Sequence, residues 1–165
     1  MAYWIVTVQE DMLEEMVRRS ALPAEERRAT ELIRPGDYVI VYVAKYYARR
    51  FGGSFVLVGK VASDWREKSE VVYPPERAIN KPVYLYEARV DYLAAGNCRM
   101  KDIMDSLAFV EDRLRLFKYV RGIPANLGRP VPEGDARVIE ECIKQNGLDL
   151  SALVRPSSSG TLGGL

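Results

Sequence analysis

Two short stretches of the sequence place positively charged side chains next to aromatic rings. They are Lys45-Tyr-Tyr-Ala-Arg-Arg-Phe51 and Arg113-Leu-Arg-Leu-Phe-Lys-Tyr-Val-Arg121. Cations bind the phosphates of a nucleic-acid strand, and flat rings stack on its bases. The candidate phosphate ligands are Lys45, Arg49, Arg50, Arg113, Arg115, Lys118 and Arg121. Aromatic core residues with solvated cations beside them would give the same pattern, so the residues alone leave both interpretations open.

The two tryptophans are candidates for the wall of an aromatic pocket. Trp4 falls in a strand-like run, where a large ring usually fills the core. Trp65 stands among charged residues in a polar segment, where a ring is more often partly exposed. Core filler and pocket wall therefore remain open for both, with the core favoured for Trp4.

Catalysis is constrained by the absence of histidine from the whole sequence. Ser-His and Cys-His nucleophile systems and His-liganded metals are thereby excluded. The enzyme alternative that remains is a magnesium-dependent nuclease in which Glu87-Ala-Arg89 imitates an acid-x-Lys pair, although arginine serves poorly as a base. We therefore expect no catalytic residue, no metal site and no cofactor.

The composition indicates one soluble domain. The chain has 165 residues, 48% of them hydrophobic, and a net charge of +1. A net charge this small excludes a protein that coats nucleic acid by bulk charge, so local patches would have to bind it. The sequence contains neither an apolar run of membrane-spanning length nor a secretory signal, which predicts a cytoplasmic location. Arginine outnumbers lysine and amide residues are few, as in many thermophile proteins.

The two cysteines, Cys98 and Cys142, have two interpretations. Two buried thiols are favoured for a cytoplasmic protein, but intracellular thermophile proteins sometimes carry disulfides.

The first half of the sequence predicts strands that could position the basic and aromatic side chains described above. Residues 3–8 are β-branched and aromatic, and Asp11 is a potential N-cap for a helix after them. Residues 34–37 form a Pro-Gly turn before an apolar run, 38–43, that is typical of a central strand. A further strand follows at 55–61, where Gly59 indicates a bulge or a tight bend.

The second half predicts a surface loop at 65–82, a long strand at 83–92 and a short helix over 100–107. A last helix begins near Pro132 and ends before Gly147. This order predicts an α/β (α+β) fold in which a strongly bent mixed sheet closes into a small barrel with helices outside.

Four motifs in order resemble the archaeal and bacterial EVE-domain proteins. They are Ala2-Tyr-Trp-Ile5, Arg34-Pro-Gly-Asp37, Ser106-Leu-Ala-Phe109 and Pro132-Glu-Gly-Asp135. The resemblance covers roughly residues 2–146 and implies a PUA-like fold related to YTH domains. Chain length and composition predict a single domain over residues 1–150, followed by a flexible Ser/Gly-rich tail or linker over 151–165.

YTH domains hold a flipped, modified base in an aromatic cage, and the resemblance implies where such a pocket would lie. Gln9 corresponds to the polar residue that reads the base edge, and Trp65 to an aromatic wall. Relatives carry tryptophan near positions 20–22 and often in the stretch equivalent to 114–116, where this chain lacks it, which predicts loose selectivity. The base-pocket candidates are Gln9, Trp65, Ser20, Leu22, Leu116, Phe117 and Trp4.

The resemblance thus implies a nucleic-acid reader that binds DNA or RNA, possibly methylated, and not a membrane. EVE domains also occur in modification-dependent restriction GTPases of the McrB type, so a fused or associated GTPase is a possible partner. A stand-alone RNA reader is the alternative within binding modules. The nuclease and a protein-partner module are the alternatives from other classes.

Overall fold

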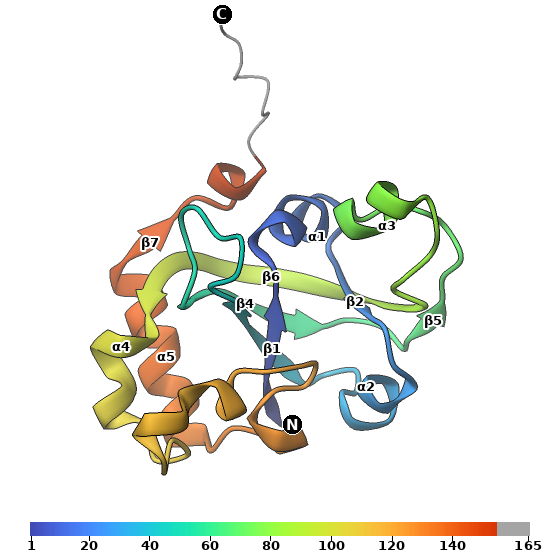
Figure 1. Ribbon diagram of the computed structural model, residues 1–165. Helices are drawn as coiled ribbons and strands as arrows, with labels where there is room; N and C mark the ends of the chain where they lie inside the picture. Colours follow the sequence, from blue (N-terminus) through green and yellow to red (C-terminus); the bar gives the residue numbers. More distant parts are fainter. Residues whose placement is uncertain (155–165) are drawn as a thin grey trace, which may run out of the picture.

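The computed structural model describes residues 1–154, which form one mixed β-sheet with short helices around it (Figure 1). The main path of the sheet runs β1 (Tyr3–Val8), β3 (Tyr38–Val43), β4 (Ser54–Val61), β6 (Tyr86–Arg99) and β2 (Ala21–Ala24). Two short strands, β5 (Arg66–Glu67) and β7 (Gly147–Leu148), also pair with β6.

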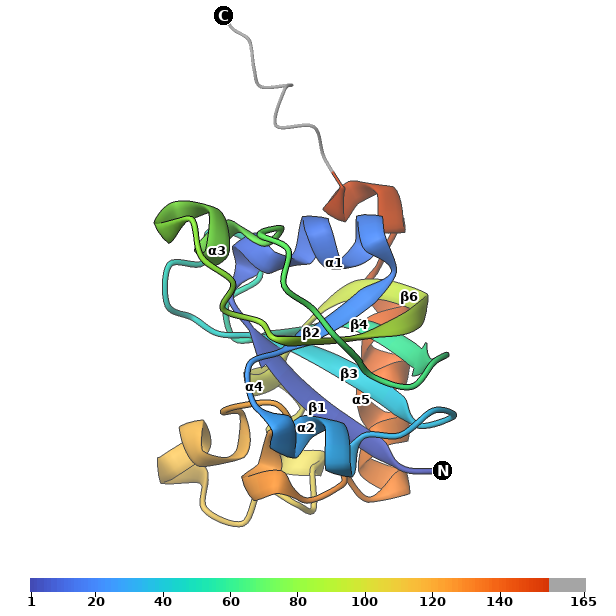
Figure 2. The same cartoon turned by 90° about the vertical axis from the view of Figure 1, so that its right-hand side faces the viewer.

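The helices are short apart from the last. The α-helices are α1 (Leu13–Arg19), α2 (Arg27–Leu32), α3 (Pro74–Ile79), α4 (Met100–Ile103) and α5 (Glu133–Gln145). The 3₁₀ helices are η1 (Glu10–Met12), η2 (Met104–Ser106), η3 (Arg113–Tyr119), η4 (Asn126–Gly128) and η5 (Leu150–Leu153). Figure 2 shows α1 and α3 on one side of the sheet and α5 on the other.

Both faces of the central strands are buried, which explains their almost continuous apolar sequences. Alternate residues of β1 enter different cores: Val6 packs in the cluster that contains Met16 of α1, whereas Ile5 packs in the cluster that contains Ile139 of α5. The prediction that 38–43 is a central strand is confirmed, because β3 lies between β1, to which it is parallel, and β4, to which it is antiparallel.

The long strand β6 bends the sheet. One part of it pairs with β4, and its first residues pair with both β2 and β5. The register between β4 and β6 shifts between Val58 and Gly59, which confirms the predicted bulge. The sheet is a curled, mixed half-barrel with short helices around it, which confirms the predicted class of a strongly bent mixed sheet with helices outside.

The connections differ from the prediction in several places. The expected loop at 65–82 contains β5 and α3, and the connector after α1 contains β2 and α2. Asp11 is not an N-cap, because it lies inside η1 and α1 begins at Leu13. The strand predicted at 83–92 starts at Tyr86 and continues to Arg99. Pairing with β6 accounts for β2 and β5, which local sequence preference did not indicate.

The folded part extends past the predicted boundary at residue 150. Residues 150–153 form η5, and Leu153 is buried in the core cluster that contains Met16 of α1. The rest of the predicted tail, 155–165, lies outside the described residues. Within residues 1–154, no helix combines the length and apolar character needed to cross a membrane.

Cys98 of β6 and Cys142 of α5 form a disulfide. The favoured interpretation of two free thiols was therefore wrong. The bond links the end of the longest strand to the longest helix, so it closes the side of the core on which α5 packs.

Candidate nucleic-acid interface

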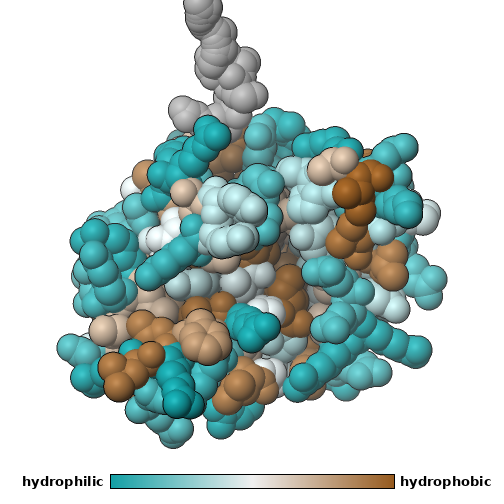
Figure 3. Space-filling model, in the orientation of Figure 1, coloured by the Kyte–Doolittle hydropathy of each residue, from teal (hydrophilic) through white to brown (hydrophobic). Residues whose placement is uncertain are grey.

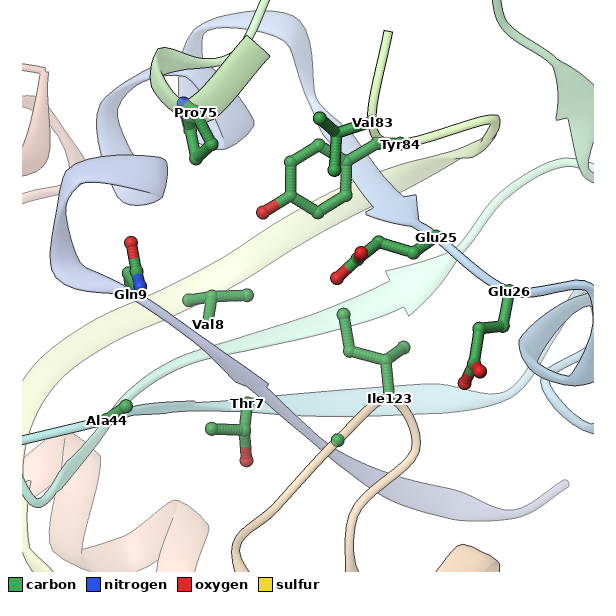
Figure 4. Close-up of a pocket in the computed structure, with 11 residues that line it drawn as sticks. Thr7, Val8, Gln9, Glu25, Glu26, Ala44, Pro75, Val83, Tyr84 and Ile123 are labelled. Carbon is green, nitrogen blue, oxygen red and sulfur yellow. The ribbon is translucent and has the colours of Figure 1, made fainter. Parts of the chain in front are cut away.

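A cavity of about 600 Å³ opens at the carboxyl ends of the parallel strands β1 and β3. Thr7 and Val8 line it from β1, Gln9 lines it directly after β1, and Ala44 lines it just after β3. The remaining walls are Glu25 and Glu26 before α2, Pro75 of α3, the segment Val83–Tyr84, and Gly122–Ile123 (Figure 4). Its size falls within the range of small-ligand pockets.

Tyr84 supplies the aromatic ring of this cavity, and polar groups surround it. Figure 4 shows the Glu25 carboxylate directed into the space between the Tyr84 ring and Ile123, with Gln9 on another side of the cavity. Burial raises the pKa of Tyr84 to about 12, and the negative charge of Glu25 acts in the same direction. The Tyr84 hydroxyl is therefore protonated near neutral pH and can donate a hydrogen bond.

A buried ion pair fixes the segment that carries Tyr84. The fully buried Glu76 accepts hydrogen bonds from the Lys68 ammonium at 2.8 and 3.0 Å. The same carboxylate accepts from the backbone nitrogens of Val83 and Tyr84, each at 2.9 Å. Tyr84 is thus held at its backbone by a carboxylate whose charge is neutralised inside the protein.

The opposite wall is anchored to β1. The backbone nitrogen of Thr7 donates to the Gly122 carbonyl at 3.1 Å, and its hydroxyl donates to the Val120 carbonyl at 2.9 Å. Gly122 has φ +92, a conformation that favours glycine. The segment that follows η3 is therefore tied to the strand that presents Gln9.

A second cavity of about 520 Å³ adjoins the first, and Ala44 lines both. Lys45, Arg99 and Lys101 line it, together with Leu116 and Phe117 of η3. The two basic-aromatic stretches, far apart in the sequence, therefore meet around one cavity. In Figure 3 hydrophobic side chains gather at the lower left of the surface, over the part where Figure 1 places α4, with hydrophilic side chains beside them.

The predicted phosphate ligands are exposed except for Lys118, which is half-buried, and some of them have acidic neighbours. Arg113 pairs with Asp105 at 3.0 Å, while Arg115 and Lys118 each lie 3.9 Å from Asp112. Exposed pairs of this kind contribute little energy, so a phosphate could replace the acid. Within residues 1–154, the ion pairs include none with Lys45, Arg49, Arg50 or Arg121.

The predicted base-pocket residues do not form one pocket. Gln9 lines the first cavity, and Leu116 and Phe117 line the second. Trp65 is half-buried, donates from Nε1 to the Ile33 carbonyl at 2.8 Å, and lines a separate cavity of about 410 Å³. The expectation that Trp65 and Gln9 face the same base is therefore corrected, because they line different cavities.

The other three candidates serve the fold. Trp4 is buried and donates from Nε1 to Asp37 at 2.9 Å, as the core interpretation predicted. Leu22 is fully buried in β2, and Ser20 ends α1 in a left-handed conformation with φ 51. None of the three lines the first or the second cavity.

Sequence reasoning missed Tyr84, Glu25, Arg99 and Lys101. Tyr84 falls within the strand predicted over residues 83–92, but β6 begins two residues later. Arg99 and Lys101 flank the junction of β6 and α4, which the pairing of β6 with β4 brings next to Gly53 and Lys45. No local pattern marks any of the four.

Glu87, the candidate nuclease acid, is held by several protein donors. It is 5% exposed and accepts hydrogen bonds from Arg19 at 2.8 and 3.0 Å, from Arg66 at 2.7 Å and from the Tyr73 hydroxyl at 2.6 Å. Burial raises its pKa, but these donors outweigh burial and lower it overall. Among residues 1–154, no three His, Cys, Asp or Glu side chains are grouped as a metal site would require.

The chain is similar to one curated protein over nearly its whole length. It is 43% identical over 150 residues to the UPF0310 protein SSO2595 of Saccharolobus solfataricus, which covers 91% of this chain and 100% of that protein. No protein-family model matches the chain.

Solved YTH domains share the fold at low sequence identity. The Mmi1 YTH domain in complex with RNA has a TM-score of 0.58 at 14% identity and covers 90% of this chain and 84% of its own. The YTH domain of Zygosaccharomyces rouxii MRB1, in complex with N6-methyladenosine RNA, has a TM-score of 0.56 at 10% identity and covers 86% of each chain. The described chain therefore has a YTH- and PUA-like fold.

Proposed function

The chain belongs to the UPF0310 family, and we propose that it is a nucleic-acid-binding module that takes one base into the cavity beside Gln9 and Tyr84. The observation that carries this proposal is that the cavity adjoins a second one lined by three cations. A base needs a ring and polar edge groups, whereas its phosphates need cations. The first cavity provides the ring and the polar groups, and the adjoining second cavity provides the cations.

In this proposal, one nucleotide leaves the stack and its base enters the first cavity. Unstacking costs a few kcal/mol, and less for a modified, mismatched or single-stranded base. The Tyr84 ring stacks on the base, and the Gln9 amide, which both donates and accepts, contacts its edge. Tyr84 is the only aromatic side chain among the described residues that line the cavity, so the selectivity is loose.

The fold neighbours support this class of function, since two of them are named as RNA complexes. We extend the proposal to an EVE-type reader, without catalytic activity, that recognises a modified base in DNA for a modification-dependent restriction system. Binding to RNA as a stand-alone protein is the second candidate, and the RNA complexes of these neighbours favour it.

Fluorescence anisotropy with matched DNA and RNA oligonucleotides tests the proposal, with each set unmodified or carrying methylated cytosine or methylated adenine. Tyr84→Ala should weaken binding by about 1 to 3 kcal/mol, the size of one base-aromatic stack, and Tyr84→Phe should keep most of that energy. Tyr86→Ala is the matched control, because Tyr86 lines the separate Trp65 cavity.

Equal dissociation constants for Tyr84→Ala and Tyr86→Ala would show that no base occupies the first cavity. Absence of binding to every oligonucleotide at low salt would overturn the nucleic-acid proposal as a whole. Cleavage of the oligonucleotides that disappears in Glu87→Gln would restore the nuclease alternative.

A further inference from the structure

We infer that the second cavity is a subsite for the nucleotide adjacent to the one whose base enters the first, with Phe117 stacking on its base and Arg99 and Lys101 binding its phosphate. This inference rests on the proposed function and adds to it the path of the bound nucleic-acid strand. The occupant is a single-stranded segment of DNA or RNA, in which neighbouring bases are free to separate.

The charges that line the two cavities determine which of them the phosphates of a bound nucleic-acid strand occupy. Glu25 and Glu26 are the charged residues at the first cavity, so a phosphate would be repelled there. Lys45, Arg99 and Lys101 are the charged residues at the second, and no described residue that lines it is acidic. The backbone of a bound strand is therefore drawn across the Ala44 boundary into the second cavity.

Phe117 is suited to stacking and poorly explained as a core residue. Its side chain is 62% exposed in a helix whose next residues, Lys118 and Tyr119, are half-buried and buried. An exposed ring beside three cations is the arrangement that proteins use to hold a base and its phosphate without reading sequence. The Arg99 side chain lies 3.1 Å from the exposed Asp102, a weak pair that a phosphate could replace.

The floor of the second cavity is preorganised. Gly52 and Gly53 line it, and the Gly53 carbonyl accepts from the Met100 backbone nitrogen at 3.0 Å, which joins the start of β4 to α4. Gly53 also donates to the Val43 carbonyl at 2.8 Å and has φ +80, which favours glycine. Lys45, Arg99 and Lys101 therefore project from backbone that is already joined by hydrogen bonds.

The test measures how tightly ligands of increasing length bind to wild type and to two variants of η3. A nucleoside monophosphate, a dinucleotide and a hexanucleotide of one base composition are titrated against wild type, Phe117→Ala and Leu114→Ala. Leu114 is the matched control, because it is 96% exposed on the same 3₁₀ helix and does not line the cavity. Phe117→Ala should weaken the dinucleotide and the hexanucleotide about tenfold, within the range of one stacking contact, and leave the monophosphate unchanged.

A charge variant provides a second readout. Lys101→Ala should reduce the slope of log K against log salt by about one, as expected for one lost phosphate contact, whereas Lys144→Ala, which removes an exposed charge of α5 that does not line the cavity, should not. Equal affinities for Phe117→Ala and Leu114→Ala, together with unchanged slopes, would overturn the subsite. If the subsite fails in this way but Tyr84→Ala still weakens binding, the proposed function stands. If Tyr84→Ala also has no effect, both the subsite and the proposed function are overturned.

Discussion

The carboxylate of Glu10 lies 2.6 Å from the backbone nitrogen of Phe51 and accepts its hydrogen bond. The backbone nitrogens of Arg49 and Arg50 donate to the same carboxylate at 2.9 to 3.2 Å. Consecutive backbone N–H groups that converge on an anion form a nest, a concave site with a positive field. Glu10 directly follows Gln9, so one turn of chain positions both the base-edge residue and the basic loop over 45–51.

Glu10→Ala should therefore free the basic loop and weaken oligonucleotide binding, although the substitution removes a negative charge that would repel phosphate. We expect Kd to rise several-fold because the loop must then be ordered on binding, at about 0.5 to 1.5 kcal/mol for each immobilised side chain. Glu14→Ala, which removes the same charge from α1, is the control and should bind as tightly as wild type or more tightly. Tighter binding by Glu10→Ala would show that the nest does not organise the loop.

Strands with a clear apolar pattern could be predicted from the sequence, because burial of both faces gives these strands an almost continuous apolar sequence. This holds for 3–8 and 38–43, and for the bulge at Gly59, where glycine marks a disturbed register. The segment 65–82 could not be predicted, because its charged residues suggest a solvated loop. Two of these charges, Lys68 and Glu76, are in fact fully buried and neutralise each other.

The candidate site was only partly predictable, because residues far apart in the sequence come together only in the folded chain. Gln9 could be placed because it directly follows a strand, and the two basic-aromatic stretches could be recognised locally. Their meeting around one cavity depends on the packing of η3 beside the loop that follows β3, and the acids opposite Arg113 and Lys118 depend on the path of η3. Trp65 was misplaced because the chain between β4 and β6 turns toward α2, where Ile33 accepts its indole N–H.

The stability of the domain should fall in acid through the titration of Glu76. Burial acts to raise the pKa of this carboxyl, but the hydrogen bonds from Lys68 and from backbone N–H groups prevail and lower it to about 2. The unfolded value is about 4.3, so the native state is stabilised by up to about 3 kcal/mol above that pH. This contribution is lost as pH falls from about 4.3 toward 2, because the unfolded chain then binds the proton first.

Urea unfolding of wild type and Glu76→Gln between pH 2 and 7 measures this effect. At neutral pH the variant should be less stable by about 3 to 5 kcal/mol, because it leaves the Lys68 ammonium buried without a counter-charge. Its stability should also depend less on pH below 4. Glu67→Gln, an exposed acid in the same segment, is the control. Parallel pH profiles for wild type and Glu76→Gln would show that another carboxyl controls acid unfolding.

The disulfide should contribute to stability without contributing to binding. Cys98 and Cys142 are 44 residues apart, and chain-entropy reasoning for a loop of that length predicts a loss of about 4 kcal/mol when the bond is absent. Unfolding of Cys98→Ser/Cys142→Ser, compared with oxidised and reduced wild type, measures this loss. At temperatures where the variant stays folded, its Kd for an oligonucleotide should match wild type, since neither cysteine lines either cavity. Identical stability of oxidised and reduced protein would contradict the expectation.

The last prediction concerns the chemistry of the base that the first cavity prefers. The Glu25 carboxylate faces the space beside the Tyr84 ring (Figure 4), and an ionised carboxylate only accepts hydrogen bonds. It therefore favours a base edge that presents N–H groups, such as the amino group of cytosine, over the carbonyl-rich edge of uracil or thymine. One well-placed contact of this type contributes about 1 to 3 kcal/mol of discrimination.

Glu25→Gln should reduce this preference, because an amide donates to a carbonyl as readily as it accepts from an amino group. The measurement is the ratio of Kd values for two oligonucleotides that differ only in one central cytosine or uracil. The ratio is needed because removing the Glu25 charge also lowers the repulsion of phosphate, which strengthens binding to both ligands alike. Glu31→Gln, at the far end of α2, is the control for that general effect. A cytosine-to-uracil ratio that stays the same in wild type and Glu25→Gln would mean that this carboxylate does not read the base, and that the preference of the cavity is set by Gln9 and Tyr84 alone.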